Sequence, residues 1–268
     1  MTVDRLALAR RAATTGGESA ADLFRTDLEV GTKSGKTDYV TRADRRAQTR
    51  VIEVIREVDP DAAIVAEEGD RRKTVPPDGP AWIIDPIDGT NNYVRGIRQW
   101  VTSVAAVVDG EAVAAANAAP ALNDLYAGGP EQIERNDERV SVSERTDPER
   151  CTITPTIWWE QDRRDEYAAA ASAIVRRFGD LYRPKSAQLA LSLIAAGSIE
   201  GAFTNRRVNP WDSIAGAFLV RQAGGTVTDI DGNPWRYDSR GLVASNGAVH
   251  DAVLAAAQTV ESVRSDGR

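Results

Sequence analysis

The chain lacks most of the side chains on which catalysis commonly depends. Its 268 residues include one cysteine, Cys151, and one histidine, His250. A single cysteine excludes an internal disulfide and a cysteine-rich zinc site, which fits a reducing compartment. A single histidine argues against Ser-His-Asp triads, Cys-His dyads and multi-histidine metal sites. We therefore expect any chemistry to depend on carboxylates, hydroxyls, lysine or arginine.

Long apolar runs and lysine are also scarce. No stretch of about eighteen apolar residues is present, so the sequence predicts no membrane span. The start, MTVDR, lacks the apolar core of a signal peptide, and we expect a cytoplasmic protein. Lysine supplies only 4 of the 33 basic residues, and the net charge is −7. This acid excess disfavours a general nucleic-acid binder, so we expect neither nucleic acid nor a membrane as a partner.

Hydrophobic periodicity predicts a layered protein of mixed α and β structure. Apolar residues spaced by three and four predict helices at 3–25, 42–58, 165–178, 187–196, 211–223 and 248–263. Short apolar runs predict strands at 63–66, 82–84, 200–204, 226–230 and 242–244, and an Asp-Gly turn predicts a hairpin of 101–108 with 111–116. Strands and helices interleave throughout. We expect one domain with subdomains of about 1–140 and 141–268, divided in the polar segment 131–148.

A turn with two aspartates follows the predicted strand at 82–84. Within residues 85–90 (DPIDGT), Pro86 restricts the backbone between Asp85 and Asp88, and Gly89 allows the turn to close. The next residues can begin a helix whose first N–H groups face the same point. Carboxylates beside exposed amides suit a hard cation next to a phosphate. Alone, such a turn is often only a loop without a bound ion.

Three other segments also place acids at the ends of predicted elements. Glu67 and Glu68 end a predicted strand, where paired acids repel each other unless a cation or solvent separates them. Asp44 lies just inside the helix predicted at 42–58, where capping by Thr41 would also explain it. Asp212 lies in the first turn of the helix predicted at 211–223, where capping is again the alternative.

Together, these segments resemble the inositol monophosphatase family, which includes archaeal-type fructose-1,6-bisphosphatases and nucleotide 3′-phosphatases. The family pattern has an acidic pair, then Asp-Pro-Ile/Leu-Asp-Gly-Thr, then Trp-Asp-x-Ala/Ser-Ala/Gly, which match residues 67–68, 85–90 and 211–216. An earlier Asp-x-Val-Thr-x-x-Asp element matches residues 38–44. The similarity covers nearly the whole chain. It implies a layered α/β/α/β/α sandwich of the sugar phosphatase type, a metal site between the two halves, and a homodimer.

The resemblance also implies roles for individual residues. It implies Mg²⁺ as cofactor, with two or three ions per active site. The implied ligands are Glu67, Asp85 and the Ile87 carbonyl for one ion, and Asp85, Asp88 and Asp212 for a second. It further implies a nucleophilic water oriented by Glu67 and Thr90, with Asp44 hydrogen-bonded to Thr90. The backbone N–H groups of Gly89 and Thr90 would bind phosphate oxygens.

The chain departs from the family pattern on the substrate side. Lys185 replaces a frequent glycine, and Asn205 replaces a glutamate that contacts inositol hydroxyls in animal members. The substrate contacts we predict are Asp88, Lys185, Ala187, Asn205, Arg206 and Asp212. Lys185, Arg206 and Arg207 suit a substrate with a second anionic group, although such arginines could equally be solvated surface. A bisphosphate such as fructose-1,6-bisphosphate is therefore at least as good a candidate as inositol phosphate.

The implied activity is Mg²⁺-dependent hydrolysis of a small phosphate monoester by a metal-activated water, with inhibition by lithium. The alternatives are a nucleotide 3′-phosphatase or NADP phosphatase of the same family and, in another class, a non-catalytic relative that binds a ligand or partner. Residues 31–37 (GTKSGKT) resemble the phosphate-binding loop of nucleotide hydrolases. That loop needs one more residue and must start a helix, whereas a β-branched stretch follows here. We therefore do not expect an NTPase.

Overall fold

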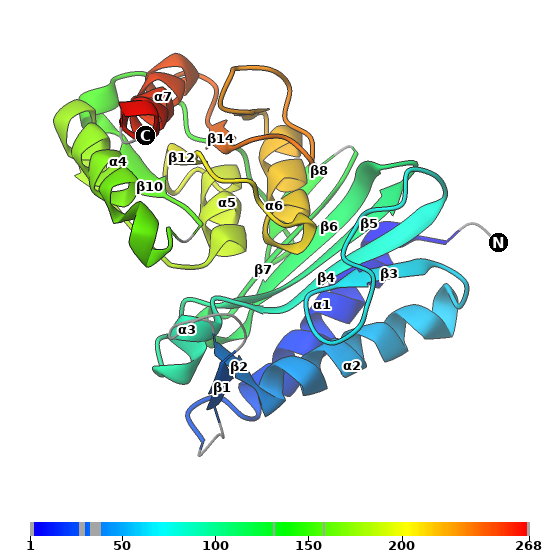
Figure 1. Cartoon of the computed structure of the whole chain (residues 1–268). Helices are drawn as coiled ribbons and strands as arrows, with labels where there is room; N and C mark the ends of the chain where they lie inside the picture. The colour runs from blue at the N-terminus through cyan, green and yellow to red at the C-terminus, as the bar shows by residue number, and fades with distance from the viewer. Residues whose placement is uncertain (1–2, 27–29, 33–38, 131, 158, 267–268) are drawn as a thin grey trace.

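The computed structural model describes residues 3–26, 30–32, 39–130, 132–157 and 159–266. Most of the NTPase-like segment at 31–37 lies outside these residues, as does Asp38. Two sheets organise the described chain (Figure 1). The larger sheet contains, in spatial order, β3 (Ala63–Ala66), β4 (Pro80–Asp88), β5 (Val101–Val108), β6 (Glu111–Ala119), β7 (Asp124–Gly129), β8 (Gln132–Arg135) and β9 (Glu138–Arg139). Its neighbouring strands are antiparallel except β3 and β4, which are parallel.

The smaller sheet is mixed and belongs to the C-terminal part of the chain. Its spatial order is β11 (Asp180–Leu181), β10 (Thr152–Pro155), β12 (Gly201–Thr204), β14 (Leu242–Ser245) and β13 (Thr226–Thr228). β10 is parallel to β11 and β12, whereas β14 is antiparallel to β12 and β13. A separate two-stranded ribbon joins β1 (Val30–Thr32) to β2 (Tyr39–Thr41).

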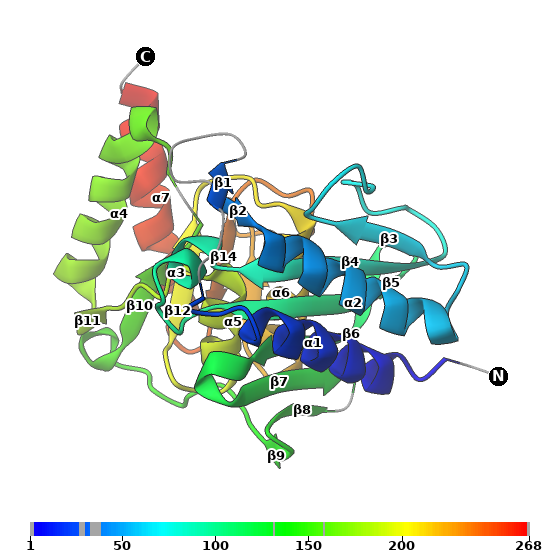
Figure 2. The same cartoon turned by 90° about the horizontal axis from the view of Figure 1, so that it is seen from below.

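Helices form the other three layers, as Figures 1 and 2 show. The pair α1 (Arg5–Ala21) and α2 (Arg42–Val58) covers the outer face of the larger sheet. Between the sheets lie α5 (Ala187–Ala195) and α6 (Pro210–Gln222). The pair α4 (Arg164–Arg177) and α7 (His250–Asp266) covers the smaller sheet. Short helices are α3 (Thr90–Val94), η1 (Pro120–Leu122), η2 (Pro148–Arg150) and η3 (Gln161–Arg163). The predicted α/β/α/β/α sandwich is confirmed.

The apolar core follows these layers. Val51 and Trp82 belong to the cluster between the outer helix pair α1–α2 and the larger sheet. Ile153 and Val253 belong to the cluster between the smaller sheet and α4–α7. A middle cluster, which includes Leu191, runs from the larger sheet through α5 and α6 to the smaller sheet. The N-terminal and C-terminal parts of the chain therefore share one core, and the subdomain boundary near residue 140 stays a prediction.

Several predicted element boundaries were wrong. The first helix ends at Ala21 rather than near residue 25. The segment 131–148 contains β8 and most of its residues are polar, but Ile133 is buried, so the strand pattern was hidden by its solvent-facing side chains. The strand predicted at 82–84 runs from Pro80 to Asp88. Its start includes Pro80 because a proline is tolerated as the first residue of a strand. Residues 85–88 thus belong to β4 and not to a free turn.

His250, the single histidine, has a structural place in the fold. It begins α7, and its ring nitrogens lie 3.0 Å from the Thr228 hydroxyl and 2.9 Å from the Ser245 hydroxyl. Burial lowers the pKa of His250, which favours the neutral ring. The side chain joins α7 to β13 and β14. In the part of the chain that the structure describes, every helix is too short or too polar to cross a bilayer.

Candidate active site

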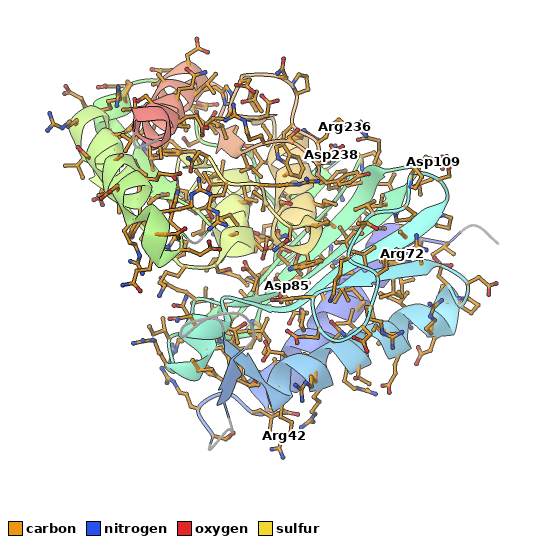
Figure 3. The ribbon with its side chains drawn as sticks, viewed as in Figure 1. Arg42, Arg72, Asp85, Asp109, Arg236 and Asp238 are labelled. Carbon is orange, nitrogen blue, oxygen red and sulfur yellow. The ribbon has the colours of Figure 1, made fainter. Side chains whose placement is uncertain are left out.

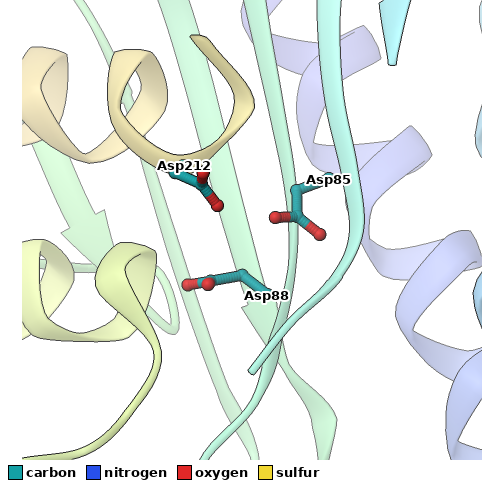
Figure 4. A group of neighbouring side chains, drawn as sticks. All are labelled: Asp85, Asp88 and Asp212. Atoms are coloured by element: carbon teal, nitrogen blue, oxygen red, sulfur yellow. The ribbon is translucent and has the colours of Figure 1, made fainter. Parts of the chain in front are cut away.

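Three aspartates from distant parts of the sequence meet between the larger sheet and α6. Asp85 and Asp88 lie on β4, and Asp212 lies in the first turn of α6 (Figure 4). One carboxylate oxygen from each residue lies within 4.8 Å of the others. Asp85 and Asp88 are buried, and Asp212 is partly buried. In Figure 3, Asp85 lies well inside the molecule, whereas Arg42 and Asp109 lie at its edges. The predicted meeting of these three residues is what the structure shows.

An irregularity in β4 lets two aspartates three residues apart face the same point. In an even strand, residues three apart point to opposite faces of the sheet. The pairing of β4 with β5 shifts register between Asp85, opposite Ser103, and Asp88, opposite Val101. Within this segment the Ile87 N–H donates to Asp85 Oδ1 at 3.0 Å. The carboxylates can therefore converge without leaving the strand.

Glu67 lies beside Asp85 but outside the group of three. It follows β3, the parallel neighbour of β4, and its N–H donates to the Ile84 carbonyl at 3.2 Å. A hydrogen bond and a charge repulsion both link the Glu67 side chain to Asp85. Lys73 fixes this segment, since its Nζ donates to the carbonyls of Ala66 at 2.8 Å and Glu67 at 2.6 Å. The predicted fourth acid is thus next to the cluster, on a backbone held in place.

Asp44 serves as a helix cap and also faces Thr90. Its Oδ2 accepts the Thr41 N–H and hydroxyl, both at 2.7 Å, which completes a capping box at the start of α2. Its Oδ1 lies 3.3 Å from the Thr90 hydroxyl, which is 2.9 Å from the Ile87 carbonyl. Burial raises the pKa of Asp44 to about 6, against the lowering effect of the Thr41 hydrogen bonds. Asp44 therefore makes both contacts expected from the sequence, one with Thr41 in the helix cap and one with Thr90.

Crowding of the carboxylates is the main electrostatic feature of the site. Burial raises the pKa of Asp85 well above its usual value, and the charges of Glu67, Asp88 and Asp212 raise it further. Burial also raises the pKa of Asp88 to about 6. Burial and the neighbouring negative charges therefore disfavour the ionised form of Asp85, and burial disfavours that of Asp88. A divalent cation with a preference for oxygen ligands, such as Mg²⁺, fits this donor set because it would neutralise the repulsion.

The start of α5 holds one oxygen of Asp88. Asp88 Oδ2 accepts the Ser186 hydroxyl and the Gln188 N–H, both at 2.6 Å. The N–H groups of Ala187 and Leu189 also lower the pKa of Asp88. A carboxylate at a helix N-terminus is stabilised by these unpaired N–H groups. Ala187, predicted as a substrate contact, therefore has its N–H directed at Asp88.

Positive charges gather beside the DPIDGT segment. Lys185 Nζ donates to Asn91 Oδ1, in the first turn of α3, at 3.0 Å. Burial lowers the pKa of Lys185, and the charges of Arg183, Arg95 and Arg164 lower it further. We call Arg95, Arg164, Arg183 and Lys185 the cationic cluster. Lys185 was predicted, whereas the arginines were missed. Arg95 and Arg164 are distant in sequence, and Arg183, two residues before Lys185, belongs to no motif.

The structure does not support the predicted substrate contact of Asn205. Asn205 is buried, and its Oδ1 accepts the Trp159 indole N–H at 2.9 Å. Its amide nitrogen donates to Glu166 at 2.5 Å and to Glu261 at 3.2 Å. These partners belong to the outer layer formed by α4 and α7 and the segment before α4, so Asn205 joins that layer to the smaller sheet.

The two arginines that follow Asn205 differ in their surroundings. Arg206 Nη2 donates to Glu160 Oε1 at 3.1 Å, and Arg207 is exposed. Sequence reasoning also missed Ser186, which caps α5 and binds Asp88. A serine just before an apolar helical pattern is the signal that could have identified it.

Replacing Asp88 with asparagine is expected to stabilise the protein in the absence of divalent ions. The pKa of Asp88 is about 6 in the folded protein and 3.8 ordinarily, so folding disfavours its charged form. The stability that protonated Asp88 contributes is therefore lost as the pH rises through 6. At pH 8 the free energy of unfolding of the Asp88→Asn variant should exceed that of wild type by roughly 1–3 kcal/mol. Near pH 4 this difference should vanish. Urea unfolding in EDTA measures this.

Asp165 supplies the matched control for this prediction. It is an exposed acid in the first turn of α4, so Asp165→Asn should lower stability at pH 8 by only a few tenths of a kcal/mol. An Asp88→Asn variant less stable than wild type at pH 8 without metal would contradict the burial penalty on the ionised Asp88 carboxylate.

Comparisons with known proteins agree with this geometry. Residues 3–262 match the model of the inositol monophosphatase family. The chain is 38% identical over 226 residues to a protein named fructose-1,6-bisphosphatase/inositol-1-monophosphatase of Thermotoga maritima, covering 84% of each. It is 34% identical over 244 residues to a protein named Nus factor SuhB of Pasteurella multocida, covering 90% of each. A solved structure of a Thermotoga maritima IMPase superposes with a TM-score of 0.88 at 33% identity, covering 97% of this chain and 99% of that one. The chain belongs to the inositol monophosphatase family.

Proposed function

We propose that the protein hydrolyses a small phosphate monoester with the help of Mg²⁺. The convergence of Asp85, Asp88 and Asp212 within 4.8 Å is the observation that carries this proposal. Glu67, Asp85 and the Ile87 carbonyl would hold one ion, and Asp85, Asp88 and Asp212 a second. When bound, such ions activate a water molecule and stabilise the charge on the departing oxygen. The fold brings the acids together, so bound cations would only have to neutralise the repulsion between the carboxylates.

We propose that Thr90 orients the attacking water. Its hydroxyl lies between the Ile87 carbonyl and Asp44 Oδ1, which restricts its rotation. We propose that this hydroxyl and the Glu67 carboxylate hold the water, and that Asp44 acts through Thr90 as a positioning residue. Bound ions would lower the pKa of that water, so no histidine base would be required.

Gly89 would bring the phosphate close to the backbone. It is the N-cap of α3 with φ 97°, a conformation that favours glycine. A Cβ at this position would lie 3.0 Å from the Gln99 carbonyl oxygen and 3.2 Å from Ser186 Cβ. The N–H groups of Gly89 and Thr90 stand at the start of a helix, where such groups bind phosphate oxygens. We propose that they do so here.

The cationic cluster supports a substrate with a second anionic group. Lys185 adopts φ 58°, so a lysine here accepts a left-handed backbone that glycine would adopt more easily. Arg183 is held with its guanidinium carbon 4.8 Å from the centre of the Tyr167 ring. Tyr167 stacks on Trp159 at 5.5 Å, and Trp159 is fixed by Asn205. We propose a bisphosphate, such as fructose-1,6-bisphosphate, as the preferred substrate, with Asn205 acting only through this stack.

Several alternative functions have some support. Inositol phosphate, nucleotide 3′-phosphates and NADP are the alternative substrates within the family. A non-catalytic, partner-binding role is suggested by the name of the Pasteurella multocida relative, Nus factor SuhB. The presence of Glu67, Asp85, Asp88, Thr90 and Asp212 supports catalysis instead. The homodimer, the lithium inhibition and the cytoplasmic location implied by the resemblance stay predictions.

Removing the Thr90 hydroxyl should impair turnover more than binding. We expect Thr90→Ala to lower kcat about 100-fold, since a positioned group of this kind contributes roughly 10²–10⁴-fold, with KM changed less than threefold. Thr90→Ser restores the hydroxyl and should keep at least one-tenth of the wild-type kcat. Phosphate release at saturating Mg²⁺ measures this. Thr49→Ala, on the exposed face of α2, is the control and should behave as wild type. A Thr90→Ala variant as active as Thr90→Ser would refute the role.

Removing the charge of Lys185 should separate the two substrate classes. We expect wild type to have a higher kcat/KM for fructose-1,6-bisphosphate than for inositol-1-phosphate. Lys185→Met should lower kcat/KM for the bisphosphate about tenfold or more, and for the monophosphate less than threefold, because a charge-assisted hydrogen bond is worth about 1.5–3 kcal/mol. Arg176→Gln, at an exposed position of α4, should change neither value. Equal losses on both substrates, or a wild-type preference for inositol phosphate, would reject the bisphosphate proposal.

A further inference from the structure

Gln188 connects the elements that carry two of the three aspartates. It is a fully buried residue in the first turn of α5, between the two sheets. Its backbone N–H donates to Asp88 Oδ2 at 2.6 Å. Its side-chain Nε2 donates to the carbonyl of Trp211, the residue before Asp212, at 2.6 Å. Its Oε1 accepts the Gly216 N–H at 2.7 Å, one turn further along α6. Gln188 thus donates a hydrogen bond to Asp88 and forms two more with the backbone of the α6 turn that contains Asp212.

The close approach of α5 and α6 makes this grip possible. A Cβ at Gly216 would lie 2.4 Å from Leu191 Cβ and 2.8 Å from Gln188 Oε1, which a real side chain could not tolerate. Only a glycine at this position lets the amide of Gln188 reach the α6 backbone. A buried amide without partners would cost stability, and here both polar atoms of the side chain are satisfied by α6. The pairing is therefore specific to these two helices.

A second set of contacts fixes Gln188 to the larger sheet. Asn117 on β6 donates its amide to the Ser192 hydroxyl at 2.9 Å and lies 3.3 Å from Gln188 Oε1. The Ser192 hydroxyl donates to the Gln188 carbonyl at 2.8 Å. Asn117 and Ser192 are both fully buried. Gln188 is consequently held by β6, and it holds α6 in turn.

We propose that Gln188 is a positioning residue that sets the separation of Asp88 and Asp212. The two carboxylates come from different parts of the fold and must stay within a fraction of an ångström of the productive geometry to bind one ion. β4 and the start of α5 fix Asp88. Asp212 accepts the Asn209 amide at 2.9 Å within the start of α6, so its distance from Asp88 depends on where α6 lies. This inference rests on the proposed function, in that the ion shared by these aspartates is the one whose affinity Gln188 controls.

Gln188→Met tests the inference by direct metal binding. Methionine has a similar length and lacks the amide, and the backbone N–H to Asp88 remains. We expect the dissociation constant for Mn²⁺, measured from free Mn²⁺ by electron paramagnetic resonance, to rise about tenfold, which corresponds to about 1.4 kcal/mol. The Mg²⁺ concentration for half-maximal phosphatase activity should rise in parallel, while kcat at saturating Mg²⁺ stays within threefold of wild type.

Two further variants make the result decisive. Ser245→Ala removes buried hydrogen bonds to His250 and Gly247 on β14, which carries none of the proposed metal ligands, so it should lower the melting temperature but leave Mn²⁺ affinity unchanged. Gln188→Asn keeps an amide too short to reach both Trp211 and Gly216, and it should weaken Mn²⁺ binding even if the methionine variant fails to fold. Wild-type affinity in the folded Gln188 variants, or equal weakening by Ser245→Ala, would overturn the inference. Wild-type protein that binds no Mn²⁺ would instead overturn the proposed function, and this inference with it.

Discussion

Mutual repulsion among buried carboxylates is the constraint on which the rest of the structure depends. Asp85 and Asp88 are buried beside each other, with Asp212 and Glu67 adjoining them. Burial raises the pKa values of Asp85 and Asp88, and the charges of Glu67, Asp88 and Asp212 raise that of Asp85 further. Such an arrangement costs folding free energy unless a cation offsets it. The surrounding fold must therefore be stable enough to hold these acids together. Three apolar clusters provide that stability, and the middle one contains residues from both parts of the chain.

The middle helices give the acids their orientation. Both α5 and α6 point their N-termini toward the cluster, so that the Ser186 hydroxyl and the Gln188 N–H meet Asp88, and Asp212 lies in the first turn of α6. Helix N-termini favour negative charge, which partly compensates for the crowding. Lys185 lies beside α3, next to the proposed phosphate site, whereas Lys73 holds the backbone at Glu67. In the proposed function, the acids would bind ions and Lys185 would bind substrate.

Sequence reasoning recovered the parts of this site that local chemistry determines. The acids sit at element ends in recognisable motifs, so Asp85, Asp88 and Asp212 could be named in advance, and the structure brings them together. What it missed depends on tertiary contacts. The amide of Asn205 finds its partners across the outer layer, and Gln188 reads as an ordinary polar residue of an apolar helix until α6 is seen beside it. The spacing and the types of residues in the sequence do not predict which helix a buried amide side chain will contact.

The most direct measurement of the central claim is the anomalous signal of Mn²⁺ in crystals grown with and without competing Mg²⁺. We predict an anomalous peak within coordination distance of oxygens from Asp85, Asp88 and Asp212, weakened by Mg²⁺ and lost in the Asp88→Asn variant. A well-ordered crystal of active protein with no peak among these three carboxylates, or with peaks only at surface acids, would contradict the account.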